Sequence, residues 1–185
     1  MLTARDFWSL DRRALADRLN SGHHIDPHAL DEKVYRGTSL GLPAIADRLL
    51  WKTFQKAFHR DGEVLRGWNV RLEQDGVEAK SRPMRRRTGE ARTFGHFLVR
   101  DVPGEAIPGG RCAGLLLDYG RGGQSALDPV SHLCDPIVAV EPGRTDLLLG
   151  WTFVKIGRLQ VGTPSFFTLE LDGPLEGPIP LPPRR

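Results

Sequence analysis

Four side chains have the chemistry that acid–base or covalent catalysis requires: Lys52, His59, Asp118 and Tyr119. Lys52 lies between Trp51 and Thr53, in a segment whose apolar residues recur at helical spacing. A lysine that is removed from water has a lowered pKa, and it can then act as a base or as an amine nucleophile. The alternative is that its ammonium group extends past the apolar neighbours to the surface.

Asp118 and Tyr119 come at the end of a nearly continuous apolar segment, residues 112–119. Because side chains alternate along a strand, the two residues point to opposite faces. We predict that Tyr119 points inward, where a phenol could anchor a ligand in an apolar pocket. Asp118 is an alternative anchor, although capping the following turn is the simpler role for it.

A second group of residues is suited to contact an apolar ligand. Lys155 shares one face of the segment 146–156 with Trp151 and Phe153, so this face could line a cavity for an amphipathic anion such as a fatty acid or polyketide acid. The alternative is that the face belongs to the core and that Lys155 lies just beyond it. The other candidate ligand-binding residues are aromatic: Tyr35, Trp51, Phe54 and Trp68.

Two histidines are further acid–base candidates. His59 precedes Arg60-Asp61, and His132 lies between Asp128 and Asp135 in the sequence, but neither set matches a known catalytic motif. His59 also fits the last turn of a helix, where a positive charge suits the helix dipole.

A metal site is suggested only by the spacing of His24 and His28, which follow His23. Pro27 lies between them and places His24 before any helix, and neither a cysteine nor a carboxylate stands at a diagnostic distance. The chain also contains no Walker loop, GxSxG motif or GxGxxG motif. We therefore expect neither a metal nor a cofactor.

The basic residues gather in one segment, residues 80–92, which carries Lys80 and five arginines. This segment could contact phosphates or an acidic partner. It lacks interleaved aromatic residues and the chain's formal charge is only +3, so we predict a solvated mobile loop and no binding of nucleic acid. The Pro-rich segment 173–185 matches ligands of proline-binding domains, or it is a disordered end without core contacts.

The composition, with 39% hydrophobic residues, is that of a globular protein. The first residues are charged and lack the apolar core of a secretory signal, and no stretch is apolar over the ~18 residues that a membrane span needs. The two cysteines, Cys112 and Cys134, do not have the spacing of a metal site. These features favour a cytoplasmic protein with free thiols.

The patterning predicts an α+β domain that is mainly antiparallel β. Helices are expected at about 11–20 and 43–59, and strands at 33–41, 65–73, 93–100, 112–119, 136–140, 146–156 and 165–171. Such a series of short strands suggests a meander that curves into a partly closed barrel or a strongly curved sheet. We assign residues 1–172 to a single domain and residues 173–185 to a C-terminal tail.

The order of these features resembles that of the small lipocalin-like (calycin-like) barrels and, more loosely, of GXWXG-type proteins. The resemblance spans roughly residues 33–171 and depends on five short segments: 35–41, 51–54, 117–119, 147–150 and 166–170. It implies a barrel with an apolar cavity, N-terminal helices and one helix inserted after the first strand. It does not imply a particular reaction.

Three functions remain open. The first is binding of a small hydrophobic or amphipathic molecule in the barrel. The second is an enzyme, such as a cyclase, isomerase or hydro-lyase, that acts on an apolar biosynthetic intermediate in the same cavity. The third is a protein-interaction module with a solid core that uses the basic segment and the tail. The sequence leaves the oligomeric state open.

Overall fold

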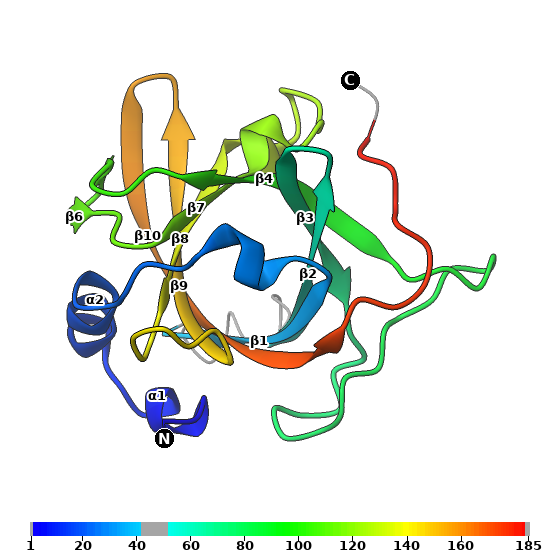
Figure 1. Cartoon of the computed structure of the whole chain (residues 1–185), viewed down its shortest axis with the longest axis horizontal. Coiled ribbons are helices and arrows are strands. Elements are labelled where there is room, and N and C mark those ends of the chain that lie inside the picture. Colours follow the sequence, from blue (N-terminus) through cyan, green and yellow to red (C-terminus); the bar gives the residue numbers. More distant parts are fainter. Residues whose placement is uncertain (1, 42–51, 184–185) are drawn as a thin grey trace.

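The chain folds into an antiparallel β-barrel, which confirms the predicted, mainly antiparallel fold class, and the barrel is fully closed (Figure 1). The computed structural model describes residues 2–41 and 52–183. Eight strands form the barrel in the order β1-β10-β9-β8-β7-β4-β3-β2. Their bounds are β1 Lys33–Leu40, β2 Thr53–Asp61, β3 Val64–Arg71, β4 Thr93–Asp101, β7 Leu115–Asp118, β8 Leu133–Ala139, β9 Leu147–Ile156 and β10 Leu159–Pro174. Each strand pairs with the barrel strands next to it in sequence, and the pairing of β1 with β10 closes the ring.

Alternation along the strands divides the apolar residues into an interior set and exterior sets. The interior set includes Tyr35, Phe58 and Phe97, which form one buried cluster. Their sequence neighbours contribute to separate clusters on the outside of the barrel. Period-two patterning therefore places one half of each strand inside the barrel and leaves the other half for additional elements to cover.

The N-terminal helices α1 (Arg5–Trp8) and α2 (Arg12–Asn20) cover part of the outer wall (Figure 1). Asp11 caps α2 by accepting a hydrogen bond from the backbone of Ala14, and the apolar residues of α2 pack on the outer faces of β8 to β10. The short hairpin of β5 (Ala106–Ile107) and β6 (Gly110–Arg111) packs on the same side. The helix expected at about residues 11–20 is confirmed by α2.

A single 3-10 turn, η1 (Pro27–Leu30), crosses one end of the barrel (Figure 1). Asp26 caps this turn, and Leu30 and Ile25 join the interior cluster. We call this end the capped end. Two further 3-10 turns, η3 (Tyr119–Arg121) and η4 (Pro129–His132), lie in the connection between β7 and β8.

The helix predicted over residues 43–59 is wrong from Thr53 onward, where the chain forms β2. Residues 43–51 of that prediction lie outside the described residues. The spacing of Phe54, Ala57 and Phe58 fits a helix and a strand equally well, because residues 54 and 58 also share one face of a strand. Pairing with β1 on one side and β3 on the other decides the outcome in favour of the strand.

The basic segment and the tail are both more ordered than the sequence suggests. Backbone hydrogen bonds from Met84 to Arg71, from Arg92 to Met84 and from Arg86 to Glu90 fold the basic segment into a hairpin-like arm. The tail runs along the outside of β2 and β3 (Figure 1), where Leu175 and Ile179 pack on the cluster around Trp68. The expectation that the tail makes no core contacts is therefore wrong.

The buried cysteines and the short helices complete the description. Cys112 and Cys134 are free, and both are buried beneath the elements that cover the outer wall. Within the described part of the chain, none of the helices has the length and apolar character needed to cross a membrane.

Candidate functional site: a buried lysine network in the barrel

A pocket of about 170 Å³ enters the barrel at the end opposite the turn η1. This is the end at which β1 finishes and β2 begins, and we call it the pocket end. The pocket has apolar walls and a polar floor. Its lining residues are Ser39, Phe54, Lys56, Asn69, Phe94, Tyr119, Val130, Leu133, Asp135, Thr152, Ser165 and Phe167.

A fully bonded lysine forms the centre of the polar floor. Lys56 Nζ donates to Asn69 Oδ1 at 2.9 Å, to Tyr119 OH at 2.5 Å and to Asp135 Oδ2 at 3.0 Å. The Tyr119 hydroxyl in turn donates to Asp135 Oδ2 at 2.8 Å, and Thr152 Oγ1 donates to Asp135 Oδ1 at 2.7 Å. These five side chains are called the lysine network below.

The lysine network spans the lumen of the barrel. Lys56 comes from β2 and Asp135 from β8, and these strands are four positions apart in either direction around the eight-stranded ring. The ion pair therefore connects opposite walls and separates the pocket from the apolar core. Lys56 and Asp135 are each only 2% exposed, so both charges are removed from water.

Burial shifts the proton equilibria of this network. It lowers the pKa of Lys56, although the charge of Asp135 acts in the opposite direction. Burial, followed by the negative charge of Asp135, raises the pKa of Tyr119 well above its usual value. Tyr119 therefore stays protonated as a hydrogen-bond donor, and Lys56 loses a proton more readily than an exposed lysine.

Aromatic rings surround the ammonium group. Lys56 Nζ lies 5.4 Å from the ring centroid of Phe54, 5.2 Å from those of Phe97 and Tyr119, and 5.1 Å from that of Phe167. Rings at this distance attract a cation through their negative faces. The cation is thus held by both the carboxylate and the rings.

Two glycines make room for the aromatic walls. A Cβ atom at Gly37 would lie 2.3 Å from the ring of Phe54, and one at Gly150 would lie 2.2 Å from the ring of Phe167. Any side chain at these positions would push the rings into the pocket. Glycine in a strand interior often marks such a close approach.

The structure places two of the predicted site residues in this pocket, Tyr119 and Phe54. Tyr119 points inward, whereas Asp118 lies on the outer face, 3.8 Å from Arg100 and 3.5 Å from Arg121. Lys52 lines a different hollow, together with Trp8 and Leu40. Trp51 lies outside the described residues.

His59 lies near the capped end and contacts Glu32. The possible ligand atoms of Asp31, Glu32 and His59 lie within 4.8 Å of one another, and Asp31 already accepts a hydrogen bond from the backbone of Arg60. This group is separate from the lysine network.

The remaining predicted ligand-binding residues lie elsewhere in the fold. Tyr35 is inside the barrel, in the apolar cluster near the capped end. Trp68 packs on the outer wall beneath the tail, and Trp151 and Phe153 pack on the outer wall beneath the N-terminal helices. Lys155 follows these two residues on the same, outward face of β9 and does not line the pocket.

Lys56, Asn69 and Thr152 were not among the sequence candidates, and Asp135 was considered only as a partner of His132. The missed signal is the run Phe54, Lys56, Phe58, in which a lysine interrupts the apolar face of a strand. Reading this segment as a helix concealed that alternation.

Comparison with protein-family models, with curated proteins and with solved structures finds no match for this chain. The function is therefore inferred from the geometry of the site.

Proposed function

We propose that the barrel binds a small amphipathic molecule at the pocket end. The observation that carries this proposal is a buried ion pair at the floor of a pocket with aromatic walls. Burying two charges costs desolvation energy that a well-packed apolar pair would not, so such a pair contributes little to stability. Perturbed ionisable groups that line a pocket are typical of functional sites.

The size of the pocket limits the ligand. A protein cavity of about 150 Å³ holds benzene, and the pocket here is about 170 Å³. The part of the ligand inside the barrel is therefore about as large as one aromatic ring or a short branched chain. Phe54, Phe94 and Phe167 supply the apolar contacts for it.

The charges of the lysine network indicate a neutral polar group at the inner end of the ligand. The positive charge of Lys56 is balanced by Asp135, and all three ammonium protons are already donated. An anion would compete with Asp135, and a cation would compete with Lys56. A hydroxyl group can donate to the Asp135 carboxylate, and a carbonyl group can share one of the donated protons, without adding a buried charge.

Catalysis by the same network is the second candidate, and the lowered pKa of Lys56 favours it. A lysine amine adds to an aldehyde or ketone to form an imine and releases water. For this reaction Lys56 must first lose a proton, and Asp135 lies 3.0 Å away as the acceptor.

The first experiment is native mass spectrometry of freshly purified protein, followed by identification of any bound compound. The binding of that compound, or of phenol as a probe, is then compared in Tyr119→Phe and Tyr35→Phe. These are the only two tyrosines of the chain, and both lie in the barrel interior. We expect Tyr119→Phe to weaken binding about 10-fold, because it removes a hydroxyl group that is hydrogen-bonded to charged side chains. Tyr35→Phe should leave binding unchanged.

Equal effects of the two variants, or no binding of any aromatic probe, would contradict the binding proposal. Reduction with borohydride in the presence of benzaldehyde tests the catalytic candidate. A covalent adduct at Lys56 would support it, whereas labelling of exposed lysines alone would count against it.

A further inference from the structure

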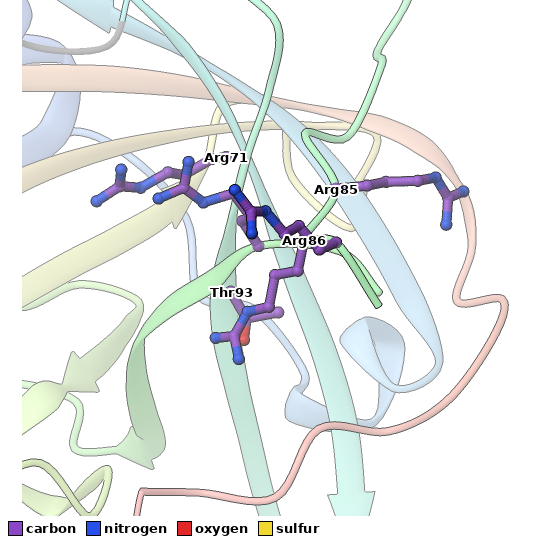
Figure 2. Close-up of a pocket in the computed structure, with 6 residues that line it drawn as sticks. Arg71, Arg85, Arg86 and Thr93 are labelled. Atoms are coloured by element: carbon purple, nitrogen blue, oxygen red, sulfur yellow. The ribbon is translucent and has the colours of Figure 1, made fainter. Parts of the chain in front are cut away.

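A second pocket, of about 450 Å³, lies beside the pocket end, at the base of the hairpin-like arm (Figure 2). Five arginines and one threonine line it: Arg71, Arg85, Arg86, Arg87, Arg92 and Thr93. We call it the arginine pocket. Arg71 ends β3 and Thr93 begins β4, so the barrel wall fixes one side of it.

Much of the charge of the arginine pocket has no acidic partner among the described residues. None of the described residues that line it is acidic. Within residues 2–41 and 52–183, no carboxylate forms an ion pair with Arg85, Arg86, Arg87 or Arg92. Elsewhere on the surface, by contrast, Arg82 pairs with Asp75. Assembling like charges is unfavourable in the absence of an anion.

Burial and the nearby charge of Arg92 both lower the pKa of Arg71. The direction of this shift fits two guanidinium groups that are held close together.

The arginine pocket and the barrel pocket share a wall. Arg71 pairs in register with Phe54, and its guanidinium carbon lies 5.6 Å from the ring centroid of Phe94. Both aromatic residues line the barrel pocket. On the other side of β3, Asn69 of the lysine network pairs in register with Phe94 of β4. A single small molecule can therefore extend from one pocket to the other.

We propose that the arginine pocket binds the phosphate or diphosphate group of the same ligand whose neutral end enters the barrel. The ligand is then a phosphorylated molecule with a compact apolar end that carries a carbonyl or hydroxyl group. This proposal rests on the function proposed above. One guanidinium group can donate two parallel hydrogen bonds to the oxygens of a phosphate. A cluster of guanidinium groups therefore matches a multiply charged anion better than it matches a single carboxylate.

The shape of the cluster favours a small ligand over a nucleic acid. A nucleic-acid surface carries a stripe of basic residues with aromatic side chains on which bases stack. Here the arginines gather at one pocket and do not form a stripe, although Figure 2 shows that the side chain of Arg85 points away from Arg71 and Thr93.

The first test measures the binding of inorganic pyrophosphate to the full chain by calorimetry at low salt. The variant Arg86→Gln/Arg92→Gln removes two charges from the arginine pocket. Its matched control, Arg13→Gln/Arg18→Gln, removes two exposed charges from α2. We expect the first variant to weaken binding at least about 10-fold, because each guanidinium–phosphate contact is a charge-assisted hydrogen bond, and the control to leave it unchanged. Equal losses, or no binding by the wild type, would overturn the proposal.

The second test asks whether one ligand occupies both pockets. Phenyl, benzyl and phenethyl phosphate place a ring at increasing distance from a phosphate. One of them should bind at least about 10-fold more tightly than inorganic phosphate, because linkage raises the effective concentration of the second group. Tyr119→Phe should remove that gain and leave phosphate binding intact.

If phosphate binds but no aryl phosphate gains affinity, the shared ligand is refuted. Phenol binding by the wild type would show that the proposed function survives such a result. Binding of a single-stranded oligonucleotide that strengthens with its length, while pyrophosphate fails to bind, would overturn the proposal in favour of a nucleic-acid partner.

Discussion

The two ends of the barrel interior are built from the same strands but have opposite chemistry. Near the capped end, Tyr35, Phe58 and Phe97 pack edge to face, with ring centroids 5.6 and 5.7 Å apart. At the pocket end, the corresponding alternate positions hold Lys56 and Asn69 in place of apolar residues. Moving one alternation along β2, from Phe58 to Lys56, changes the interior from a packed core to a polar site.

Under the proposed function, this difference separates the residues that stabilise the fold from those that bind a ligand within one lumen. The capped end follows the ordinary rule that alternate strand positions are apolar and closely packed. The pocket end departs from that rule at several positions on different strands, and the departures form one hydrogen-bonded network. Departures of this kind are expected where a fold retains an energetic cost for a functional reason.

The largest loss of stability should follow from truncation at the capped end. Phe58→Ala should reduce the free energy of unfolding by about 4 kcal/mol, because it removes a fully buried ring from a packed cluster. Phe54→Ala, at the half-buried wall of the pocket, should cost clearly less and should weaken ligand binding. Urea denaturation measures both. If Phe54→Ala costs as much as Phe58→Ala, the division of the interior into two ends is incorrect.

Breaking the ion pair should have the next largest effect. Asp135→Asn leaves the Lys56 ammonium buried without its counter-ion, and we expect a loss of about 3 kcal/mol. The control is Asp118→Asn on the adjacent strand, where the carboxylate faces outward and contacts Arg100 and Arg121. An outward ion pair contributes about 1 kcal/mol or less. If urea denaturation shows that the two variants lose equal free energy of unfolding, a buried unpaired ammonium group costs no more than an outward one.

A pH response of the outer wall should be smaller. Burial, followed by the charge of Arg66, lowers the pKa of His96 to about 4. The unfolded chain then binds a proton more readily than the folded chain between pH 6.5 and about 4. Stability should therefore be complete above pH 6.5 and decrease by about 1–3 kcal/mol as the pH falls through that window.

The measurement is the urea midpoint of unfolding at pH values across the window, for the wild type and for His96→Gln. The variant should flatten the dependence on pH. An unchanged slope in His96→Gln would assign the acid response to other groups.

The smallest loss of stability should come from replacing the whole ion pair. Lys56→Met/Asp135→Leu removes both charges and should be neutral or stabilising by up to about 3 kcal/mol, as reported by the same urea denaturation. Binding of the phenol probe should nevertheless be lost. A variant that folds stably but does not bind phenol would show that the lysine network serves binding. Retention of phenol binding would show that the apolar walls suffice.

The strands with clear alternation or continuous apolar character could be predicted from the sequence. The segments 33–41, 93–100 and 146–156 all became strands, because period-two patterning is a local property. Closure of the barrel was predicted only in part, since it depends on pairing between the first and last strands. The segment after Thr53 was assigned incorrectly because its apolar spacing suits both periods, and only the neighbouring strands decide between them.

The site was harder to predict than the fold. The inward direction of Tyr119 follows from alternation and the structure shows it, but its partners come from other strands. Lys56 and Asp135 are 79 residues apart in the sequence, on opposite walls of the barrel. No local pattern connects them, because their proximity is created by closure of the ring.

The pairing of β1 with β10 has a consequence for the synthesis of the protein. As the chain leaves the ribosome, β1 emerges early and must wait for its partner, whose last residue is Pro174. Until then β1 and β9 each present an unpaired edge, the kind of surface through which nascent chains associate. Ser165 and Phe167 of the pocket also lie on this late strand. The pocket is thus completed only after β10 has been synthesised, and a molecule that enters it can stabilise only chains that have reached that stage.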